Sequence, residues 1–365
     1  MKIVFFSMAM NKGGAERVIS ILSNNGLGID NEIHILTCLK GDTQYLLNDD
    51  VIRHEGFLSF DEYRKKGKIK TLPILCRKYR QAIQQIDPDI VISFLPEPCF
   101  IASLCKKKVG KPLIGSERGN PYYRYRSPIY KMLTSWLYPK SDGFVFQTEG
   151  ARAYFDEKLQ KKSVIIGNPV AIPDQFRQLP ERRVKEIVSV GRFTPEKNYP
   201  LLLKAFQKVT EQTSDYVLKI YGKVDESLRL AELSQELGIS DKVFFMGQVD
   251  NILERIRNAS VFVLSSSSEG MPNALMEAMA IGLPVVATDC PPGGPRQLIC
   301  DGENGLLVPN DDVDALATAI IRIIRDEHLS HKLSENALKI TDEYSEEKIC
   351  NQWKAYVDKV LKENS

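Results

Sequence analysis

The chain has 365 residues, of which 43% are hydrophobic and 26% charged, a composition typical of a globular protein. It is too long for one ordinary core, so we expect two domains of somewhat less than about 200 residues each. No stretch approaches the roughly 20 apolar residues that span a bilayer, and the opening run KIVFFSMAM is too short for a secretion signal. These features exclude an integral membrane protein and predict a cytoplasmic one.

The cysteine pattern and the charge distribution further limit the classes of function that the chain could have. The seven cysteines are scattered and form no C-x-x-C pair, so the sequence predicts neither a metal site nor a disulfide framework, and we expect no cofactor. Residues 1–167 carry 26 Lys and Arg against 17 Asp and Glu, a net charge of +9. Residues 168–365 carry 23 against 30, a net charge of −7. This asymmetry predicts an anionic partner for the first half only.

Short apolar runs alternate with helical segments along the whole chain. Unbroken apolar strands separated by helices are typical of parallel sheets covered on both faces, so we predict an α/β protein with two Rossmann-like domains. The expected strands are 2–7, 32–38, 90–95, 113–116, 144–147 and 164–167 in the first half, and 187–190, 217–221, 243–246, 261–264, 285–288 and 306–308 in the second.

The segment GNPVAIP, residues 167–173, follows a strand and contains two prolines, which favours a domain boundary there. We therefore predict domains at 1–167 and 168–344. A final helix over 345–365 has Ser345 as its N-cap candidate and an apolar stripe that includes Trp353.

Glycines follow the first predicted strand. Gly13 and Gly14 open an amphipathic helix, where free backbone N–H groups suit a phosphate. The pattern is not G-x-G-x-x-G, so dinucleotide binding gains little support. A tight turn alone would also explain both glycines.

The strand at 113–116 leads into Glu117 and Arg118. Arg118 could hold an anionic ligand or a phosphate, and the competing interpretation is a salt bridge to Glu117. The following run YYRYR is too short for a nucleic-acid platform, so no nucleic-acid partner is expected.

Basic clusters occur at 64–70, 77–80 and 106–108. Together with Leu72, Ile74 and Leu75 they could form a peripheral surface for an anionic membrane. Ordinary solvated surface is the competing interpretation.

The first strand of the second half ends in GRFTPEKN, residues 191–198. Arg192 supplies a forked donor and Lys197 a point charge, so the two could hold a diphosphate from two sides. A solvated surface pair is the alternative. Gly247 ends a later strand, where an ordinary turn is equally consistent with the sequence.

The stretch 265–284, SSSSEGMPNALMEAMAIGLP, is the most informative in the chain. It predicts a helix that begins at Pro272 and ends before Gly282. Glu269 and Glu277 stand on either side of the helix start, where two carboxylates could accept hydrogen bonds from a polyol. Alternatively, they are a helix-start charge and a solvated position.

This stretch resembles the signature of glycosyltransferase family 4, the retaining group 1 enzymes of bacterial glycan assembly. The signature is E-G-[MP]-P-x-x-x-x-E followed by A-x-G-x-P-V-[VI]-A-T, and residues 269–277 and 280–288 carry it here. The resemblance implies the GT-B architecture, in which two Rossmann-like domains face each other across a cleft and the terminal helix crosses back to the N-terminal domain.

The resemblance also implies roles for individual residues. Arg192 and Lys197 would neutralise the donor diphosphate, Glu277 would bind the ribose diol and Glu269 a hydroxyl of the donor sugar. Many relatives have a histidine at the position of Arg118, which puts the role of this residue in doubt. The implied catalytic residues are Arg192, Lys197, Glu269 and Arg118; the donor-binding residues are Gly13, Gly14, Arg192, Lys197, Gly247, Gln248, Val249, Glu269, Gly270, Met271, Pro272, Asn273 and Glu277; and the acceptor-side residues are Glu16, Glu117 and Arg118.

We therefore expect a metal-independent hexosyl- or N-acetylhexosaminyltransferase that uses a nucleotide sugar, with UDP as the expected nucleotide, and a glycan or polyprenyl-linked acceptor. The alternatives are a non-catalytic protein that binds sugar nucleotides and an NAD-dependent dehydrogenase. A dehydrogenase should have an acidic residue after the second strand, where this chain has Lys40.

Overall fold

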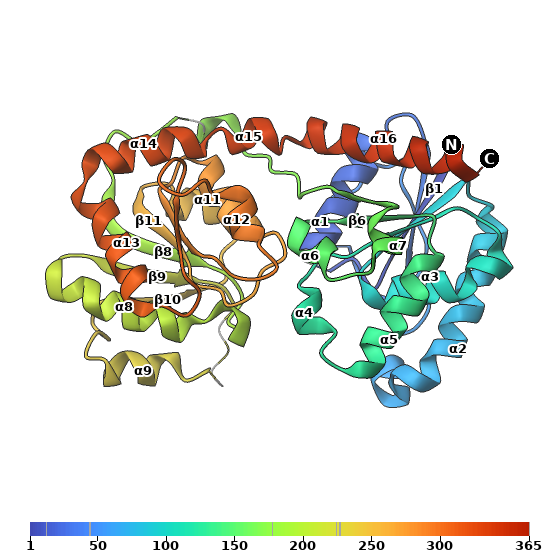
Figure 1. Ribbon diagram of the computed structural model, residues 1–365, viewed down its shortest axis with the longest axis horizontal. Helices are drawn as coiled ribbons and strands as arrows, with labels where there is room; N and C mark the ends of the chain where they lie inside the picture. Colours follow the sequence, from blue (N-terminus) through green and yellow to red (C-terminus); the bar gives the residue numbers. More distant parts are fainter. Residues whose placement is uncertain (12, 44, 177, 224, 226–227, 365) are drawn as a thin grey trace. The chain divides into compact units, whose positions relative to one another are not determined.

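The computed structural model describes residues 1–365 except 12, 44, 177, 224, 226–227 and 365. Lys12, in the predicted glycine loop, therefore lies outside the described residues. The chain divides into two compact units, each a parallel sheet with helices on its faces (Figure 1). Unit 1 is Met1–Pro169 with Glu346–Ser365, and unit 2 is Val170–Ser345.

In the described part of unit 1 the sheet has seven strands in the order β3-β2-β1-β4-β5-β6-β7, and every paired neighbour is parallel. This is a doubly wound order, with a switch of direction between β1 and β4. Its elements are β1 Lys2–Ser7, α1 Gly14–Ile21, η1 Leu22–Gly26, β2 Glu32–Thr37, β3 Ile52–Arg53, α2 Phe60–Ile86, β4 Ile90–Phe94, α3 Pro96–Val109, β5 Leu113–Ser116, α4 Pro121–Arg124, α5 Pro128–Leu137, η2 Tyr138–Lys140, β6 Gly143–Phe146, α6 Glu149–Ala153, α7 Glu157–Gln160, β7 Ser163–Ile165 and α16 Glu346–Asn364.

Unit 2 repeats the plan with six described strands in the order β10-β9-β8-β11-β12-β13, again all parallel. Here the switch of direction lies between β8 and β11. Its elements are η3 Asp174–Phe176, β8 Val184–Val190, η4 Pro195–Lys197, α8 Tyr199–Gln212, β9 Val217–Tyr221, α9 Leu230–Glu236, β10 Val243–Gly247, α10 Ile252–Ile256, β11 Ala259–Leu264, α11 Asn273–Ala280, β12 Val285–Thr288, α12 Gly294–Leu298, β13 Leu306–Val308, α13 Val313–Arg325, α14 Glu327–Ala337 and α15 Ile340–Glu343.

Every strand that the sequence predicts is present, with ends that differ by no more than three residues. The central strands β1, β4 and β11 are buried along most of their length because helices cover both faces, and β8 is buried at Ile187, Val188 and Ser189. The short strand β3 at Ile52–Arg53 was missed, since both of its residues are exposed and give no apolar signal.

The terminal helix α16 packs on unit 1 through the predicted apolar stripe. Ile349, Trp353, Val357 and Val360 are all buried. The Trp353 ring stacks on Phe94 with centroids 5.6 Å apart, and α16 lies against η1 (Figure 1). The nineteen residues of α16 thus pack on the core of unit 1, although they follow unit 2 in the sequence.

Helix α11 differs from the prediction at its start. Pro272 was expected at the first helical position, but its ψ of 103° is extended and the helix begins at Asn273. Pro272 is instead the N-cap, because its carbonyl accepts hydrogen bonds from the N–H groups of Leu275 and Met276, each at 3.1 Å. The end is as predicted: Gly282 has φ 66°, and Leu275, Ala278 and Met279 face the core.

Helix α2 begins with a complete capping box. The Ser59 Oγ accepts a hydrogen bond from the Glu62 N–H at 3.1 Å, and the Ser59 N–H donates to the Glu62 carboxylate at 2.9 Å. The helix is interrupted at Gly67, whose φ of 72° and ψ of 164° are not helical. The first turns of α2 therefore form a separate basic segment before the long helix that covers the sheet.

We expect Ser59→Ala to lower the free energy of unfolding of unit 1 by about 1 kcal/mol, because it leaves the first N–H groups of α2 without their acceptor. Urea unfolding followed by circular dichroism measures this change. Ser59→Asp is the control and should restore most of the loss, since aspartate also caps. An unchanged midpoint for Ser59→Ala would show that water replaces the cap at no cost.

Candidate functional site

The loops after β8 and β11 meet at the switch point of the unit 2 sheet. The Lys197 Nζ contacts the Glu269 Oε1 at 2.6 Å, and the Ser266 Oγ donates to the same carboxylate oxygen at 2.7 Å. The two charged side chains are largely buried, with 19% and 14% of their surface exposed. Carboxyl ends of strands that flank a switch point border the ligand-binding crevice of doubly wound folds. The topology thus brings two predicted site residues, 72 positions apart in sequence, into contact.

Backbone hydrogen bonds fix the relative positions of these loops. The Ser267 N–H donates to the Glu196 carbonyl at 2.8 Å, and the Ser265 hydroxyl donates to the Lys197 carbonyl at 2.9 Å. The Glu269 N–H in turn donates to the carbonyl of Pro291 in the loop after β12, at 3.0 Å. The loop that carries Glu269 is therefore held by the backbone of two other loops, and the Glu269 carboxylate by Lys197 and Ser266.

Three glycines line the neighbouring strand ends. The Gly191 N–H donates to the Tyr221 carbonyl and the Gly222 N–H to the Gly247 carbonyl, both at 2.9 Å. A Cβ on Gly222 would lie 1.8 Å from the Gly191 oxygen, so only glycine permits this approach. Gly247 has φ 70°, and it places the exposed Gln248 and the half-buried Val249 beyond the end of β10. These three predicted donor-binding residues thus lie at or just beyond the end of β10, which is two positions from β8 in the sheet.

Arg192 differs from Lys197 in its surroundings. Its side chain is exposed, and within the part of the chain that the structure describes it forms no ion pair with a carboxylate. Arg192 and Lys197 lie on one loop, which begins at Gly191 and continues through η4. The loop thus offers one exposed cation and one cation compensated by Glu269.

The remaining predicted donor-binding residues surround the start of α11. Met271 and Pro272 are buried, whereas Asn273 and Glu277 are half-buried on the helix. Gly270 lies against the loop after β12, because a Cβ on Gly294 would lie 1.8 Å from the Gly270 carbonyl oxygen. Close backbone packing therefore holds the segment between Glu269 and the helix.

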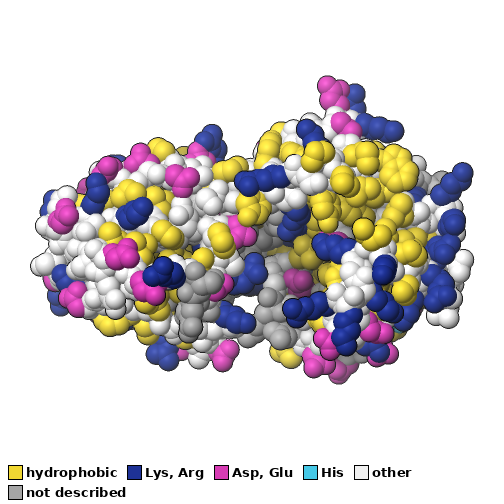
Figure 2. All heavy atoms as spheres, turned by 90° about the horizontal axis from the view of Figure 1, so that it is seen from below, with side chains coloured by type: hydrophobic (Ala, Val, Ile, Leu, Met, Phe, Trp, Pro, Cys, Tyr) yellow, Lys and Arg dark blue, Asp and Glu magenta, His cyan; other side chains and the backbone are white. Residues whose placement is uncertain are grey.

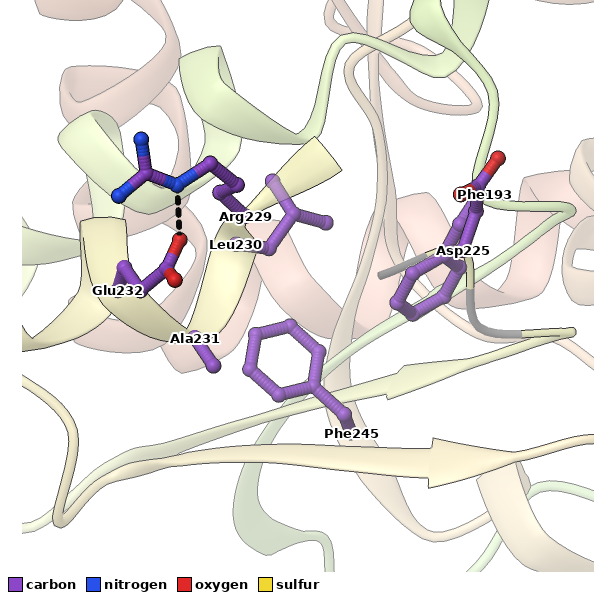
Figure 3. A pocket seen from close by; sticks show the side chains of 7 residues that line it. All are labelled: Phe193, Asp225, Arg229, Leu230, Ala231, Glu232 and Phe245. Carbon is purple, nitrogen blue, oxygen red and sulfur yellow. Dashed lines mark hydrogen bonds and ion pairs between the residues drawn. The ribbon is translucent and has the colours of Figure 1, made fainter. Parts of the chain in front are cut away.

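A cavity in unit 2 opens beside the Arg192 loop but contains none of the predicted site residues. Phe193 and Phe245 face each other across it, with ring centroids 5.9 Å apart, and an Arg229–Glu232 ion pair lies at its rim (Figure 3). Its other lining residues are Asp225, Leu230 and Ala231. It lies on the α9 side of the sheet edge, away from the Lys197–Glu269 contact.

In unit 1, α1 begins at Gly14, directly after the predicted glycine turn. A Cβ on Gly13 would lie 2.2 Å from the Glu16 Oε2, so the Glu16 side chain folds back over the backbone of Gly13. The Tyr45 hydroxyl donates to the Gly13 carbonyl at 3.0 Å. The glycine thus makes room for a carboxylate, which compensates the positive end of the helix.

Arg118 is a half-buried cation that pairs with no carboxylate in the part of the chain that the structure describes. Its Nη2 donates to the Asn168 Oδ1 at 2.5 Å, and its guanidinium lies over the Phe94 ring at 5.5 Å. Its Nε and Nη1 are buried and have no hydrogen-bond partner among the described residues. Burial lowers the pKa of the Arg118 guanidinium to about 9, so the group is still charged at neutral pH. Such an arrangement favours an anion that completes the hydrogen bonds.

The expected alternative, a salt bridge between Glu117 and Arg118, is wrong. Arg124 takes that place, with its Nη1 3.1 Å from the Glu117 Oε1. The Glu117 side chain is fully buried and also accepts a hydrogen bond from Tyr125, whose hydroxyl is 2.7 Å from that of Tyr138. The charge of Glu117 is thus neutralised by Arg124 of α4, and Arg118 forms no ion pair with it.

A second cavity, of about 360 Å³, lies at the carboxyl edge of the unit 1 sheet. Met8 follows β1 and Leu95 follows β4, so the cavity occupies the switch point of this sheet. Sequence reasoning missed most of its lining; the YYRYR run and the basic cluster at 64–70 were the available signals. The other lining residues are Lys68, Pro96, Glu97, Arg124, Tyr125 and Tyr130.

Two family profiles together match nearly the whole chain. The profile of the family described as glycosyl transferases group 1 matches residues 172–340. The profile described as glycosyltransferase family 4 matches residues 12–172. Their boundary falls close to the division between the two units.

Two of the curated relatives align over nearly their full length. The chain is 31% identical over 360 residues to an uncharacterized glycosyltransferase of Haemophilus influenzae, covering 97% of this chain and 99% of the relative. It is 28% identical over 359 residues, with 97% of each chain covered, to a Campylobacter jejuni enzyme named as an α-1,4-N-acetyl-D-galactosaminyltransferase that acts on a diphospho-undecaprenol-linked glycan.

Solved structures share the fold at lower identity. HepE of Anabaena, crystallised in complex with UDP, superposes with a TM-score of 0.83 at 18% identity and covers 98% of this chain and 100% of its own. Sucrose-phosphate synthase of Thermosynechococcus elongatus superposes with a TM-score of 0.81 at 19% identity, with 99% of each chain covered. Both likenesses extend over the two Rossmann-like units.

Proposed function

Because the chain belongs to the group 1 glycosyltransferases of family 4 and has their GT-B fold, we propose that it transfers a sugar, with retention of anomeric configuration, from a UDP-sugar to a glycan or lipid-linked glycan. The observation that carries the proposal is the 2.6 Å contact of Lys197 with Glu269 beside the exposed Arg192. This contact supports the proposal because a cation for a diphosphate and an acceptor for sugar hydroxyls lie side by side at the switch point.

The two cations have complementary tasks in this proposal. When the bond from the anomeric carbon to the diphosphate oxygen breaks, negative charge develops on the leaving UDP. Arg192 is exposed and can reach the diphosphate from solvent, while Lys197 is already held in place by Glu269. Preorganised charges of this kind stabilise a transition state because they need no rearrangement during the reaction.

The carboxylates then orient the donor. Glu269 accepts hydrogen bonds from the sugar, and Glu277, on the helix, from the ribose diol. Since Glu269 is already paired with Lys197, it is a weak candidate for a covalent nucleophile. We therefore propose a same-face displacement, in which the acceptor oxygen bonds to the anomeric carbon and its proton passes to the departing phosphate oxygen. No metal is assigned a role in this mechanism.

The acceptor is assigned to unit 1. Its cavity at the carboxyl edge of the sheet is lined by Lys68, Arg124 and Tyr130, and Arg118 follows β5, the strand that pairs with β4. Cationic and aromatic groups together suit a glycan carried on a diphosphate. The Campylobacter relative, which acts on a glycan linked to diphospho-undecaprenol, supports a polyprenyl-linked acceptor for this chain, reached at the cytoplasmic membrane surface.

A donor screen followed by a turnover assay tests this function. UDP-sugars are expected to raise the melting temperature more than GDP- or ADP-sugars, and UDP should be released in proportion to the glycan formed. The proton coupling constant of the new linkage should show the α configuration from an α-linked donor. A β product would contradict retention, and saturable binding without turnover on any lipid-linked acceptor would indicate a sugar-nucleotide-binding protein instead.

A further inference from the structure

Helix α5, Pro128–Leu137, is apolar on both of its faces. Thr134 and Leu137 are buried on the inner face, against the aromatic cluster of unit 1. On the outer face Ile129, Met132 and Trp136 are 64%, 63% and 57% exposed. Their spacing of three and four residues places them on one stripe. Burial in unit 1 therefore does not account for this second apolar face.

The short helix α4 and the start of α2 extend this surface. Tyr122 and Tyr123 of α4 are each 47% exposed, and Ile69 of α2 is 89% exposed. The start of α2 lies beside α5, because Lys68 and Tyr130 line the same cavity. We call this surface the α5 face: Tyr122, Tyr123, Ile129, Met132, Trp136 and Ile69.

Exposed cations border the α5 face. The Lys140 Nζ lies 3.3 Å above the centre of the Trp136 ring, and the Arg126 guanidinium lies 4.4 Å above that of Tyr123. In the described part of the chain, none of the bordering cations forms an ion pair with an acidic side chain, and Figure 2 shows hydrophobic side chains beside Lys and Arg side chains on unit 1. The bordering cations are Arg64, Lys65, Lys66, Lys70, Arg126, Lys131 and Lys140.

The region of the basic cluster at 106–108 differs, because two of its lysines are paired with aspartates. Lys106 pairs with Asp142 at 2.9 Å and Lys111 with Asp87 at 2.5 Å. Both lysines lie at the end of α3, which runs back to the amino edge of the sheet. Leu75, which the sequence placed on the same basic surface, is buried in the core. Within the described residues, the α5 face thus combines unpaired cations with exposed apolar side chains, whereas Lys106 and Lys111 are each paired with an aspartate.

We propose that the α5 face binds an anionic phospholipid bilayer, with Ile129, Met132 and Trp136 inserted at the headgroup level. An apolar stripe edged by unpaired lysines and arginines, with a lysine over a tryptophan, has the chemistry of an interfacial amphipathic helix. A bilayer supplies both the apolar layer and the diffuse negative charge that this surface complements. Among the described residues no helix has the length and apolar character to cross a membrane, so binding takes place from one side.

The position of the α5 face bears on the acceptor, a step that rests on the proposed function. Tyr130 lines the unit 1 cavity, and its neighbour in sequence, Ile129, belongs to the α5 face. Lys68 and Ile69 of α2 repeat this arrangement from the other side. A lipid-linked acceptor in the bound bilayer would thus present its head group at the mouth of the cavity.

Trp136 provides a direct test, because the chain has two tryptophans and the other, Trp353, is fully buried. Vesicles of phosphatidylglycerol and phosphatidylcholine should shift the tryptophan emission to shorter wavelength, and brominated lipids should quench it. Trp136→Phe should abolish both signals while leaving co-sedimentation largely intact. An emission unchanged by vesicles that do bind the protein would contradict insertion at the α5 face.

Two variants separate the apolar and charged contributions in co-sedimentation assays. Ile129→Glu with Met132→Glu should reduce vesicle binding at least tenfold, and Lys65→Ala with Lys66→Ala should reduce it about twenty-five-fold at low salt, or about fivefold per charge. Ile29→Glu changes an equally exposed residue of unit 1, 70% exposed, and is the matched control that should bind normally.

The emission and co-sedimentation assays measure vesicle binding without any sugar transfer. A negative result in them therefore leaves the proposed transferase function intact. The proposal is overturned if the α5 variants bind vesicles as tightly as the unchanged protein. It is equally overturned if the unchanged protein does not bind anionic vesicles at low salt and light scattering shows a dimer that the α5 variants convert to monomers. The α5 face would then bind a second copy of the chain.

Discussion

Arg192→Ala and Lys197→Ala are each expected to lower kcat by about a hundred- to a thousand-fold, equivalent to roughly 3 to 4 kcal/mol of transition-state stabilisation. The reason is that, in the proposed function, both cations meet charge that develops only as the diphosphate leaves. The change should therefore appear at saturating donor, with a smaller effect on KM. Initial rates over a range of UDP-sugar concentrations measure it, after circular dichroism and melting have shown that the variants are folded.

A second possible reason for lost activity in Lys197→Ala is that the Glu269 carboxylate is left without its ion-pair partner. A double variant distinguishes this effect from the loss of a diphosphate contact. If Lys197 only neutralises Glu269, adding Glu269→Gln should raise the activity of Lys197→Ala to that of Glu269→Gln alone, because no unpaired carboxylate remains. If Lys197 meets the diphosphate, the double variant should be no more active than either single one. Lys219→Ala is the matched control, since Lys219 pairs with Glu186 in the same unit and is expected to retain near-normal kcat. Near-normal rates in both Arg192→Ala and Lys197→Ala would mean that this loop does not bind the donor diphosphate.

Glu277→Gln is expected to behave differently from the cation variants. It keeps the size of the side chain but weakens the hydrogen bonds that we propose Glu277 accepts from the ribose diol both before and during the reaction. KM for the donor should thus rise about tenfold while kcat changes little. A fall in kcat as large as that of Lys197→Ala would place Glu277 at the reacting centre instead.

The sequence predicted the elements of both units because most of their strands are buried on both faces and therefore appear as unbroken apolar runs. It also singled out the loops after β8 and β11, which the strand order of this doubly wound sheet places together. The start of α11 was placed one residue too early. Proline suits both the N-cap and the first helical position, and the choice depends on its ψ, which composition does not specify.

The side-chain pairs of unit 1 could not be predicted from the sequence. Glu117 and Arg118 are adjacent in sequence, and the simplest interpretation pairs them. The β-strand that precedes them points successive side chains to opposite sides, so Glu117 turns toward Arg124 and Tyr125. Arg118 instead meets Asn168, fifty residues away. Contacts of such separation depend on how helices pack on the sheet, which periodicity alone does not reveal.

The same limit explains why the α5 face was missed. The pattern of α5 is that of a core helix, with apolar residues on most of its circumference, and sequence cannot distinguish the half that meets the sheet from the half that meets solvent. The fold supplies this distinction by burying Leu137 and leaving Met132 and Trp136 exposed. Charge clusters alone gave equal weight to residues 64–70 and 106–108, although the latter are partly neutralised by Asp142.

Arg118→Ala is expected to lower kcat about a hundredfold while changing KM for the UDP-sugar by no more than about threefold. Two of its guanidinium nitrogens are buried without a hydrogen-bond partner among the described residues, and no carboxylate neutralises it. Keeping a cation in this state is costly unless an anion or a developing negative charge completes its hydrogen bonds during function. The burial that lowers its pKa to about 9 also makes any such interaction strong.

Three substitutions at this position distinguish the proposed role from a structural one. Arg118→Lys keeps the charge but loses the fork, so it should recover only part of kcat. Arg118→His introduces the residue that many relatives carry and should be more active than alanine if the position serves catalysis. Asn168 keeps a donor in every variant, because the Gln147 Nε2 also contacts its Oδ1 at 2.7 Å, so the fold should tolerate all three. If removing the unpaired cation instead raises the melting temperature and lowers kcat and donor affinity equally, Arg118 is a ground-state phosphate contact. Equal activity of the alanine and lysine variants would show that its charge takes no part in transfer at all.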